Sequence, residues 1–255
     1  MSKDKISVLF LTKYSRTGAS SRYRFLQYFP YLEAHGIQCR LSPLMDDKYL
    51  SHLYAMKRGS VLDIAKALCR RMAALMTAHK HDVVMIEYEI LPYFPPVFEN
   101  IMKKMNIPLI VNYDDAIFYR YSQHPRPWIR RLLANKIDAV MKAVDLVIAG
   151  NSFLADYARR AGAVHVETVP SVVDLDRYPA SEHRDNGIFT IGWIGSPSTS
   201  KYLEGIAPAL AKVCELGRGR VLLIGSGRIK LAGVPIEIRP WSEEGEVGDL
   251  RSCDV

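Results

Sequence analysis

The sequence predicts an α/β protein built from two units, each a doubly wound parallel sheet of the Rossmann type. Short apolar runs of strand length alternate with helical patterns along the 255 residues, which is typical of βαβ units. A strand, a Gly/Ser loop and a helix follow one another at Ile6–Leu11 and again at Ile188–Ile194. Between them, Pro179–Gly187 is rich in Pro, Asn and charge, as interdomain linkers are. We therefore place one unit at residues 1–183 and a second at residues 184–255.

The composition predicts a soluble globular protein, with 49% hydrophobic and 24% charged residues. No apolar run is long enough to span a bilayer, and the polar start gives no secretory signal, so we expect the cytoplasm. The four cysteines are dispersed without a C-x-x-C pair, which predicts reduced structural thiols. The net charge of +7 indicates an anionic partner: a nucleotide diphosphate, an anionic lipid surface or a nucleic acid. Nucleic acid is the least expected, because no aromatic-basic motif is present.

The first strand is predicted at Ile6–Leu11 and leads through a loop into a helix. In doubly wound sheets, ligands bind at the carboxyl ends of the strands. The loop therefore supplies candidate binding residues, which are Gly18, Ser20, Ser21 and Arg22. The alternative is that Gly18 makes the turn, a serine caps the helix and Arg22 is solvated.

A second strand is predicted at Ile37–Leu41, and the region Met45–His81 is predicted to be helical. Basic residues are interleaved with apolar ones in this region, a pattern that suits an anionic membrane surface. The same pattern suits a surface helix with its apolar face on the core, which is our default interpretation. The helix predicted at Trp128–Val144 has a similar mixture. Peripheral contact with a membrane rests on these two segments.

The third strand is predicted at Asp82–Ile86 and is followed by Glu87-Tyr88-Glu89. Carboxylates at alternate strand positions point to the same face and can share a site, or they can form a solvated strand end. Glu87 is the functional candidate because it lies nearer the carboxyl end of the strand. Tyr88 and Tyr93 are packing residues or a sugar-stacking surface, and packing is the default.

The next strand, Pro108–Val111, is followed closely by Asp114 and Asp115. Acids at the end of a buried strand are costly unless they are paired, hydrogen-bonded or functional. Both are therefore candidate site residues, and the alternative is that Asp115 caps the following turn. His124, in the loop beyond, either hydrogen-bonds to a donor sugar or faces solvent.

The remaining elements follow the same alternation. A strand is predicted at Asp145–Ala149, and the next helix is capped by Asn151 or Ser152 and ended by Gly162. The strands of the second unit are predicted at Ile188–Ile194, Arg220–Ile224 and Val234–Arg239. The last residues, C-D-V, look like the start of another strand.

The loop Gly195–Ser200 precedes a helix that is predicted to start near Lys201. Free amides and hydroxyls at a helix N-terminus, with a lysine in the first turn, suit an anion such as phosphate. The alternative is an ordinary β-to-α turn with Lys201 on a solvated face. The loop lacks the spacing of a Walker or dinucleotide fingerprint, and Gly225-Ser226-Gly227 is too short for one.

Several segments resemble retaining glycosyltransferases of family 4, also called group 1. They are V-P-S-V-V-D-L-D-R-Y and G-W-I-G-S-P-S-T-S-K-Y-L at the crossover between the units, G-A-S-S-R-Y-R-F-L-Q-Y-F-P-Y-L near the start, and N-S-F-L-A-D-Y-A before the crossover. Their order and spacing extend the resemblance over almost the whole chain. The resemblance implies the GT-B fold, in which two Rossmann-like domains face each other.

The resemblance also implies roles in the second unit. In this family a loop after the crossover strand holds the donor's diphosphate, and a basic residue lies early in the next helix. Gly195, Ser196 and Lys201 match these positions, and Lys201 with the amides would stabilise the departing diphosphate. Arg239 and Trp241 would lie near the nucleobase, with Trp241 stacked on the base or on the core. No metal or other cofactor is then required.

On the acceptor side, the resemblance places the loop with Gly18, Ser20, Ser21 and Arg22 at the acceptor and the cleft. Family members often carry Y-D-x-D-D-A-I, and here Asn112 replaces the first acid of D-x-D-D while Asp114 and Asp115 remain. We infer that Asp114 or Asp115 orders the cleft or binds sugar hydroxyls. Both join Lys201 as catalytic candidates, and Glu87 joins the acceptor side.

Family members continue beyond C-D-V into a segment with two glutamates separated by seven residues, so we expect a second domain that is C-terminally truncated and a donor pocket that is incomplete. The truncated chain alone is then either active or inactive. The predicted function is transfer of a sugar from a nucleotide diphosphate sugar to a glycan, lipid-linked or small-molecule acceptor, with retention. The predicted location is the cytoplasm or the inner face of its membrane. The alternatives are a non-catalytic nucleotide- or sugar-binding module and a GT-B nucleotide-sugar epimerase.

Overall fold

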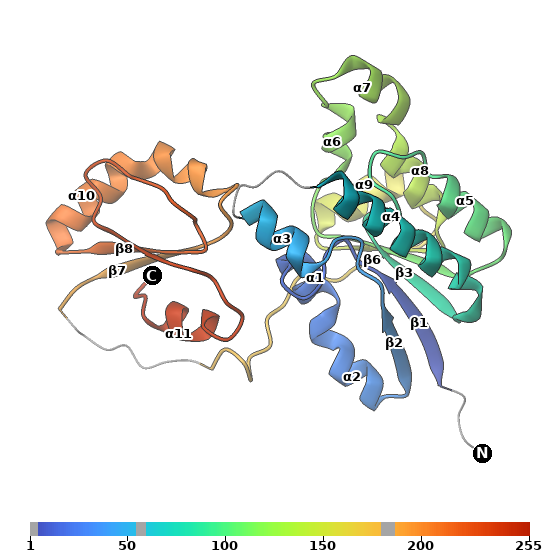
Figure 1. The fold of residues 1–255 in the computed structure, drawn as a ribbon, viewed down its shortest axis with the longest axis horizontal. Coiled ribbons are helices and arrows are strands. Elements are labelled where there is room, and N and C mark those ends of the chain that lie inside the picture. Colours follow the sequence, from blue (N-terminus) through green and yellow to red (C-terminus); the bar gives the residue numbers. More distant parts are fainter. Residues whose placement is uncertain (1–4, 55–59, 180–186) are drawn as a thin grey trace. The chain divides into compact units, whose positions relative to one another are not determined.

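The computed structural model describes residues 5–54, 60–179 and 187–255, and it divides into two compact units. Unit 1 comprises residues 5–50 and 60–173, and unit 2 comprises residues 51–54, 174–179 and 187–255. Each unit contains its own parallel sheet with helices, so the predicted α/β class is confirmed (Figure 1). The predicted boundary between residues 183 and 184 lies outside the described residues.

Unit 1 is built on a six-stranded parallel sheet in the order β2-β1-β3-β4-β5-β6. The strands are β1 (Ile6–Leu11), β2 (Ile37–Leu41), β3 (Val83–Glu87), β4 (Leu109–Tyr113), β5 (Leu146–Ala149) and β6 (Val166–Thr168). Leu11, Ile86 and Val111 are fully buried in the interior strands β1, β3 and β4. Central strands of a parallel sheet are covered on both faces, which is why their sequences are apolar runs.

The helices of unit 1 complete two apolar layers against this sheet. They are α1 (Ala19–Arg24), α2 (Phe29–Ala34), α4 (Val61–Met76), α5 (Val97–Lys104), α6 (Phe118–Ser122), α7 (Pro127–Leu133), α8 (Lys136–Ala143) and α9 (Ser152–Arg160), with 3₁₀ turns at η1 (Leu26–Tyr28) and η2 (Ala78–Lys80). The helix α3 (Asp47–Tyr54) begins in unit 1, and its residues 51–54 belong to unit 2. Val8 and Phe10 belong to one cluster, with Phe25 of the α1–η1 junction. Leu9 and Leu11 belong to a second, larger cluster, as expected for side chains that alternate between the faces of a strand.

The predicted boundaries of α9 are confirmed by its cap residues. Asn151 Oδ1 accepts a hydrogen bond of 3.0 Å from the amide of Leu154, as an N-cap does. At the other end, Gly162 has a φ of +91°, a left-handed conformation that glycine adopts without steric cost.

Three helical predictions were too coarse. The region Met45–His81 contains two separate helices, α3 and α4, with residues 55–59 outside the description. The segment Trp128–Val144 is divided into α7 and α8 by a non-helical Asn135, a residue type whose side chain competes with helical hydrogen bonds. The helix predicted from Lys201 starts as a 3₁₀ helix, because Pro208 has no amide hydrogen to donate to the carbonyl four residues earlier.

Unit 2 has a three-stranded parallel sheet in the order β7-β8-β9. Its elements are β7 (Thr190–Ile194), η3 (Ser200–Ile206), α10 (Ala207–Gly217), β8 (Arg220–Ile224), β9 (Ile236–Arg239) and α11 (Glu246–Arg251). The core is formed by Leu203, Cys214, Val221 and Leu223 with their neighbours. Backbone hydrogen bonds join residues 254–255 to β7, from the amide of Asp254 to Thr190 O (2.9 Å) and from that of Gly192 to Val255 O (2.6 Å).

Candidate functional site

In unit 1, polar side chains from three neighbouring segments meet at the carboxyl edge of the sheet. Glu87 ends β3, Asp114 follows β4, and Ser20 lies in α1, which follows β1. Ser20 Oγ lies 2.9 Å from Glu87 Oε1 and 2.9 Å from Asp114 Oδ2. Tyr88 donates its hydroxyl hydrogen to Asp114. We call Ser20, Glu87, Tyr88 and Asp114 the acid cluster.

The hydroxyl hydrogens available in the acid cluster determine whether both of its carboxyl groups can be charged and still accept a hydrogen bond from Ser20. Ser20 contacts two carboxylates but has a single hydroxyl hydrogen, so it can donate to only one of them. If Glu87 carries a proton, Glu87 donates to Ser20 and Ser20 donates to Asp114, so both contacts of Ser20 with the carboxyl groups are satisfied. Protonation of Glu87 thus couples to the hydrogen bonds of Asp114.

The surroundings of Glu87 act on its pKa in opposite directions. The side chain is 2% exposed, and burial raises its pKa because the charged form loses hydration. Hydrogen bonds from Ser21 Oγ (2.6 Å) and the Lys13 amide (2.7 Å) to Oε2 offset part of this rise. Burial also lowers the pKa of the neighbouring Lys13. The site is therefore desolvated and held by several donors.

A buried arginine, which the sequence did not mark as functional, fixes the loop after β1. Arg71 of α4 is 1% exposed, and its Nη2 donates to the carbonyl of Thr12 at 2.5 Å. Burial lowers the pKa of Arg71 to about 10, while the negative charge of Glu87 acts in the opposite direction. Arg71 thus interacts electrostatically with Glu87 and positions the backbone next to Lys13.

The other predicted residues of this loop have structural constraints. A Cβ on Gly18 would lie 2.3 Å from Tyr14 Cβ, so only glycine fits at the N-cap of α1. Arg22 is 4% exposed, and its guanidinium lies 4.8 Å from the ring centre of Tyr23. The alternative of a solvated Arg22 is therefore wrong.

The amide that replaces the family's first acid has a specific partner. Asn112 Oδ1 accepts a hydrogen bond of 3.0 Å from Nε of Arg24, and both side chains are buried. Arg24 also donates to the carbonyl of Val169 at 2.8 Å. The α1 helix is thereby joined to β4 and to the segment after β6. Arg24 is a second arginine that the sequence did not mark.

Asp115 lies at the surface, unlike Glu87. Although the side chain is exposed, partial loss of hydration and the negative charge of Asp114 raise the pKa of Asp115. Its carbonyl, rather than its side chain, accepts from the amide of Ile117, and α6 begins without a side-chain cap. The carboxylate of Asp115 is thus available to a ligand.

Glu89 does not share the site with Glu87, and that prediction was wrong. The strand ends at Glu87, and Tyr88 has a φ of +66°, so the alternation of a strand does not continue to Glu89. Glu89 is buried and forms an ion pair with Lys136. Tyr121 Oη lies 2.8 and 2.7 Å from its two oxygens and donates its hydroxyl hydrogen to this carboxylate. Glu89 is neither a solvated strand end nor part of the acid cluster.

In unit 2, the loops after β7 and β8 come into direct contact at the carboxyl edge of the sheet. Gly225 has a φ of +78°, and a Cβ there would lie 2.4 Å from Gly195 O and 3.1 Å from Trp241 Cβ. Trp241 follows β9, so the loops of all three strands meet around Gly225. A Cβ on Gly195 would lie 2.5 Å from the ring of Trp193. Both glycines are required by close approach of neighbouring atoms.

Within this edge the loop after β7 satisfies many of its own hydrogen bonds. The Gly195 amide donates to Ile224 O at 3.0 Å, so it is already used within the sheet. Ser196 Oγ lies 2.8 Å from Ser198 Oγ, and Ser198 is exposed. Lys201 is exposed in η3, with Nζ 5.2 Å from the ring centre of Tyr202. The hydroxyls of Ser196 and Ser198 and the ammonium group of Lys201 can therefore rotate toward a bound anion without loss of any helical hydrogen bond.

Arg239 and Trp241 are engaged with acids of unit 2. Nε of Arg239 donates to Glu237 (2.7 Å), and Nη1 donates to Asp249 (2.8 Å). These two carboxylates raise the pKa of Arg239, Asp249 contributing most. Trp241 Nε1 donates to Glu246 at 2.6 Å. The hydrogen bond fixes the plane of the indole, which is half-buried.

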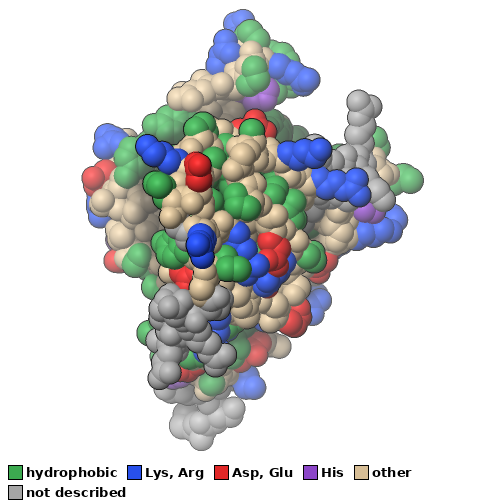
Figure 2. Space-filling model, turned by 90° about the vertical axis from the view of Figure 1, so that its left-hand side faces the viewer, with side chains coloured by type: hydrophobic (Ala, Val, Ile, Leu, Met, Phe, Trp, Pro, Cys, Tyr) green, Lys and Arg blue, Asp and Glu red, His purple; other side chains and the backbone are tan. Residues whose placement is uncertain are grey.

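Charged side chains of both signs are interspersed among apolar ones on the face seen in Figure 2, so the net charge of +7 is not gathered there. Within the described residues no group of three or more His, Cys, Asp or Glu is arranged to hold a metal ion. No helix in that part of the chain is both long and apolar enough to cross a bilayer.

No protein-family model and no curated protein matches the chain. Solved structures do resemble it. An α,α-trehalose 6-phosphate synthase from Burkholderia multivorans has a TM-score of 0.57 and 13% identity over 95% of this chain and 75% of that one. A putative UDP-N-acetylglucosamine 2-epimerase from Listeria monocytogenes has a TM-score of 0.57 and 12% identity over 98% and 73%. The S. aureus MnaA–UDP co-structure has a TM-score of 0.55 and 12% identity over 96% and 71%.

These neighbours are GT-B proteins, so the predicted GT-B fold is confirmed. At 12–13% identity the likeness is one of fold. The family and the chemistry of this chain therefore depend on its own residues.

Proposed function

We propose that the chain acts as a glycosyltransferase that takes its sugar from a nucleoside diphosphate sugar and retains the anomeric configuration. The observation that carries the proposal is the meeting of the β7, β8 and β9 loops at one edge of unit 2, with Lys201 exposed in the 3₁₀ helix that follows the serine-bearing loop. Ligands of open α/β sheets bind at this edge. Retention and membership of glycosyltransferase family 4 are supported by the motifs of the sequence.

In unit 2 the donor's diphosphate would bind Lys201 and the hydroxyls of Ser196 and Ser198. As the bond to the sugar breaks, negative charge grows on the diphosphate, and a lysine held close to it lowers the energy of that state. The Gly195 amide is bound within the sheet, so its role is to shape the loop. The indole of Trp241, held by Glu246, is the surface proposed for the nucleobase.

In unit 1 the exposed Asp115 and the accessible side of Asp114 would bind hydroxyl groups of the acceptor or the sugar. Glu87 is 2% exposed, so it acts through Ser20 rather than by touching a substrate. The acid cluster then positions Asp114. Because Asp114 receives hydrogen bonds from Ser20 and Tyr88, its orientation is set before a substrate arrives.

The test is titration of the chain with UDP-, GDP- and ADP-sugars, in parallel with Lys201→Ala. One nucleotide is expected to bind, and Lys201→Ala is expected to weaken it about tenfold or more, since a hydrogen bond to a charged group contributes roughly 1.5–3 kcal/mol. The anomeric configuration of the product, read by NMR, tests retention. Binding that is equal with and without Lys201 would contradict the proposed donor site.

A nucleotide-sugar epimerase is the second candidate, because the neighbours include two proteins titled UDP-N-acetylglucosamine 2-epimerases. Conversion of a UDP-sugar to its epimer with no acceptor present would favour it. A non-catalytic binding module would bind the nucleotide sugar and leave it unchanged.

Peripheral contact with an anionic membrane is proposed for α4, where Val61 and Leu62 are 81% and 70% exposed. Cosedimentation with vesicles containing phosphatidylglycerol tests it. Vesicles of phosphatidylcholine alone are the control.

A further inference from the structure

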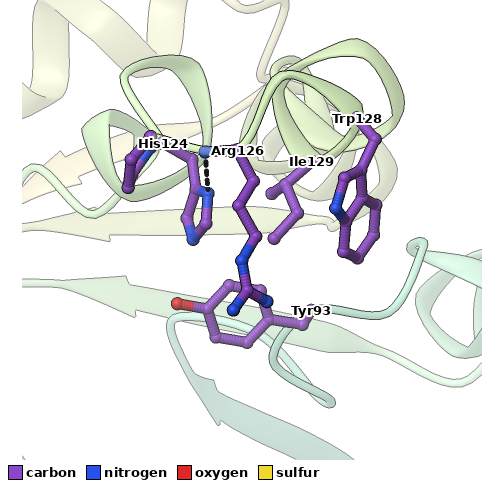
Figure 3. Close-up of a pocket in the computed structure, with 6 residues that line it drawn as sticks. Tyr93, His124, Arg126, Trp128 and Ile129 are labelled. Atoms are coloured by element: carbon purple, nitrogen blue, oxygen red, sulfur yellow. Dashed lines mark hydrogen bonds between the residues drawn. The ribbon is translucent and has the colours of Figure 1, made fainter.

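Unit 1 contains a pocket whose lining residues lie outside the acid cluster. Its volume is about 480 Å³, and it is lined by Tyr93, His124, Pro125, Arg126, Trp128 and Ile129. The side chains of His124, Arg126 and Trp128 extend from the α6–α7 segment toward Tyr93 (Figure 3). One wall therefore comes from the segment after β4 and the other from the turn after β3.

The walls offer flat apolar surfaces. Tyr93 is 52% exposed and Trp128 is 58% exposed, although both are large aromatic side chains. Ile129, which also lines the pocket, is 4% exposed. Aromatic walls with a few polar groups are typical of small-ligand pockets. The C–H face of a pyranose ring packs against such a wall.

The charge of the pocket is positive. Arg126 is among its lining residues, and no Asp or Glu is. The sequence has no Asp or Glu between Asp115 and Asp138. Besides Arg126, the same stretch contains Arg120, Arg130 and Arg131. A guanidinium group favours carboxylate or phosphate because it can donate two parallel hydrogen bonds.

The pocket is held in place before any ligand binds. The amide of Arg126 donates to Nδ1 of His124 at 3.1 Å, so in the neutral ring Nε2 carries the hydrogen and is a donor. Arg130 Nη1 donates to the carbonyl of His124 at 2.5 Å.

The opposite wall is also fixed, at a cost in backbone energy. Tyr93 has a φ of +59°, which is uncommon for a residue with a bulky side chain. Its amide is bound by Tyr121 Oη at 3.0 Å, and its ring packs edge-on against His124 at 5.9 Å. Backbone strain of this kind clusters at functional sites.

We propose that this pocket binds a pyranose that carries a carboxylate or phosphate group. The ring packs against Trp128 and Tyr93, and the anion receives hydrogen bonds from Arg126 and from His124 Nε2. The further statement that this sugar belongs to the acceptor rests on the proposed function. Binding itself does not.

The whole chain is titrated by calorimetry with glucuronate, glucose 6-phosphate, glucose and inorganic phosphate. At least one anionic sugar is expected to bind tenfold or more tightly than both glucose and phosphate. The choice between glucuronate and glucose 6-phosphate identifies the anion. Arg126→Ala is expected to reduce its affinity to that of glucose, and Trp128→Ala to weaken it about tenfold.

Arg131→Ala is the matched control, because Arg131 is an exposed arginine of α7 that does not line the pocket. It is expected to change nothing. Arg126→Lys, which keeps the charge, is expected to keep part of the preference and guards against loss of folding. The proposal is overturned if neither anionic sugar binds better than glucose, if phosphate binds as tightly as the anionic sugar, or if Arg131→Ala has the effect of Arg126→Ala.

The same samples are titrated with the nucleotide sugar. Loss of nucleotide binding with normal binding of the anionic sugar would overturn the proposed function and leave the pocket in place. Normal binding of the nucleotide sugar without binding of the anionic sugar would overturn the proposed role of the pocket and leave the proposed function in place.

Discussion

The polar groups at the two sheet edges are held in different ways. In unit 1, Glu87 and Tyr88 are 2% and 4% exposed and are bound to other side chains of the acid cluster. In unit 2, Ser198 of the loop after β7 and Lys201 of η3 are both exposed. Burial makes the unit 1 groups part of the fold, whereas exposure leaves the unit 2 groups free to serve a ligand. Substitutions should therefore reduce stability in unit 1 and binding in unit 2.

The largest effect is expected for Glu87→Ala. It removes the carboxylate that accepts hydrogen bonds from the Lys13 amide and from Ser21 Oγ, and it leaves these two donors without that partner. Each such group costs about 1–3 kcal/mol, so a loss of about 3 kcal/mol or more in the free energy of unfolding is expected. Urea denaturation measures it. Asp115→Ala, at the exposed acid nearby, should change stability by less than about 0.5 kcal/mol, and an equal effect would remove the distinction between buried and exposed acids.

Gly225→Ala tests whether unit 2 also contains a rigid point. The new Cβ would lie 2.4 Å from Gly195 O at a φ of +78°, so backbone must move, with an expected loss of about 2–3 kcal/mol. Gly36→Ala is the matched control, because Gly36 has a φ of +84° and open space around it. Gly36→Ala should lose only the free energy needed to hold alanine at a positive φ, about 1 kcal/mol. Similar thermal shifts for the two variants would show that the contact with Gly195 is unimportant.

Lys201→Ala should affect binding and leave stability unchanged. The side chain is exposed, so the free energy of unfolding should change by less than about 0.5 kcal/mol. Lys212→Ala, at an exposed lysine of α10, is the control for loss of charge. A large fall in the thermal midpoint of Lys201→Ala would show instead that Lys201 stabilises the fold, as Glu87 does in unit 1.

The smallest effect is a pH dependence that originates in Glu87. Because burial raises its pKa in the folded state, Glu87 favours folding when protonated. Its contribution is complete below the pKa of an unfolded glutamate, about 4.3, and is lost as pH rises through the higher folded pKa. Glu87→Gln keeps the shape of the side chain but has no carboxyl group that can gain or lose a proton. The stability of the wild type minus that of Glu87→Gln should fall as pH rises above about 4, and a flat difference would contradict the raised pKa.

Much of the fold was predictable because it depends on local patterns. The strands Ile6–Leu11 and Arg220–Ile224 have the predicted boundaries, since buried parallel strands are apolar along their whole length. The 3₁₀ start of the helix at Lys201 was missed, although Pro208 marks it in the sequence. The division of α7 from α8 depends on Asn135, a weak signal within a helical pattern.

The candidate site was predictable only in part. Ser20, Glu87 and Asp114 were each candidates because they lie near the ends of predicted strands, where ligands of such sheets bind. Their hydrogen bonds to one another were not predicted. Arg24 and Arg71 were missed because their partners, Asn112 and Thr12 O, are remote in sequence. Nothing in a run of residues tells a buried arginine from a solvated one.

The 3₁₀ geometry of η3 has a consequence for hydrogen exchange. Bonds between residues three apart are weaker than those of an α-helix, so the amide hydrogens of residues 201–206 should exchange with solvent sooner than those of α10. The segment that carries Lys201 then opens locally at little cost in free energy, while the sheet beside it remains closed. A bound anion would slow this exchange, and the protected amides would mark its position residue by residue.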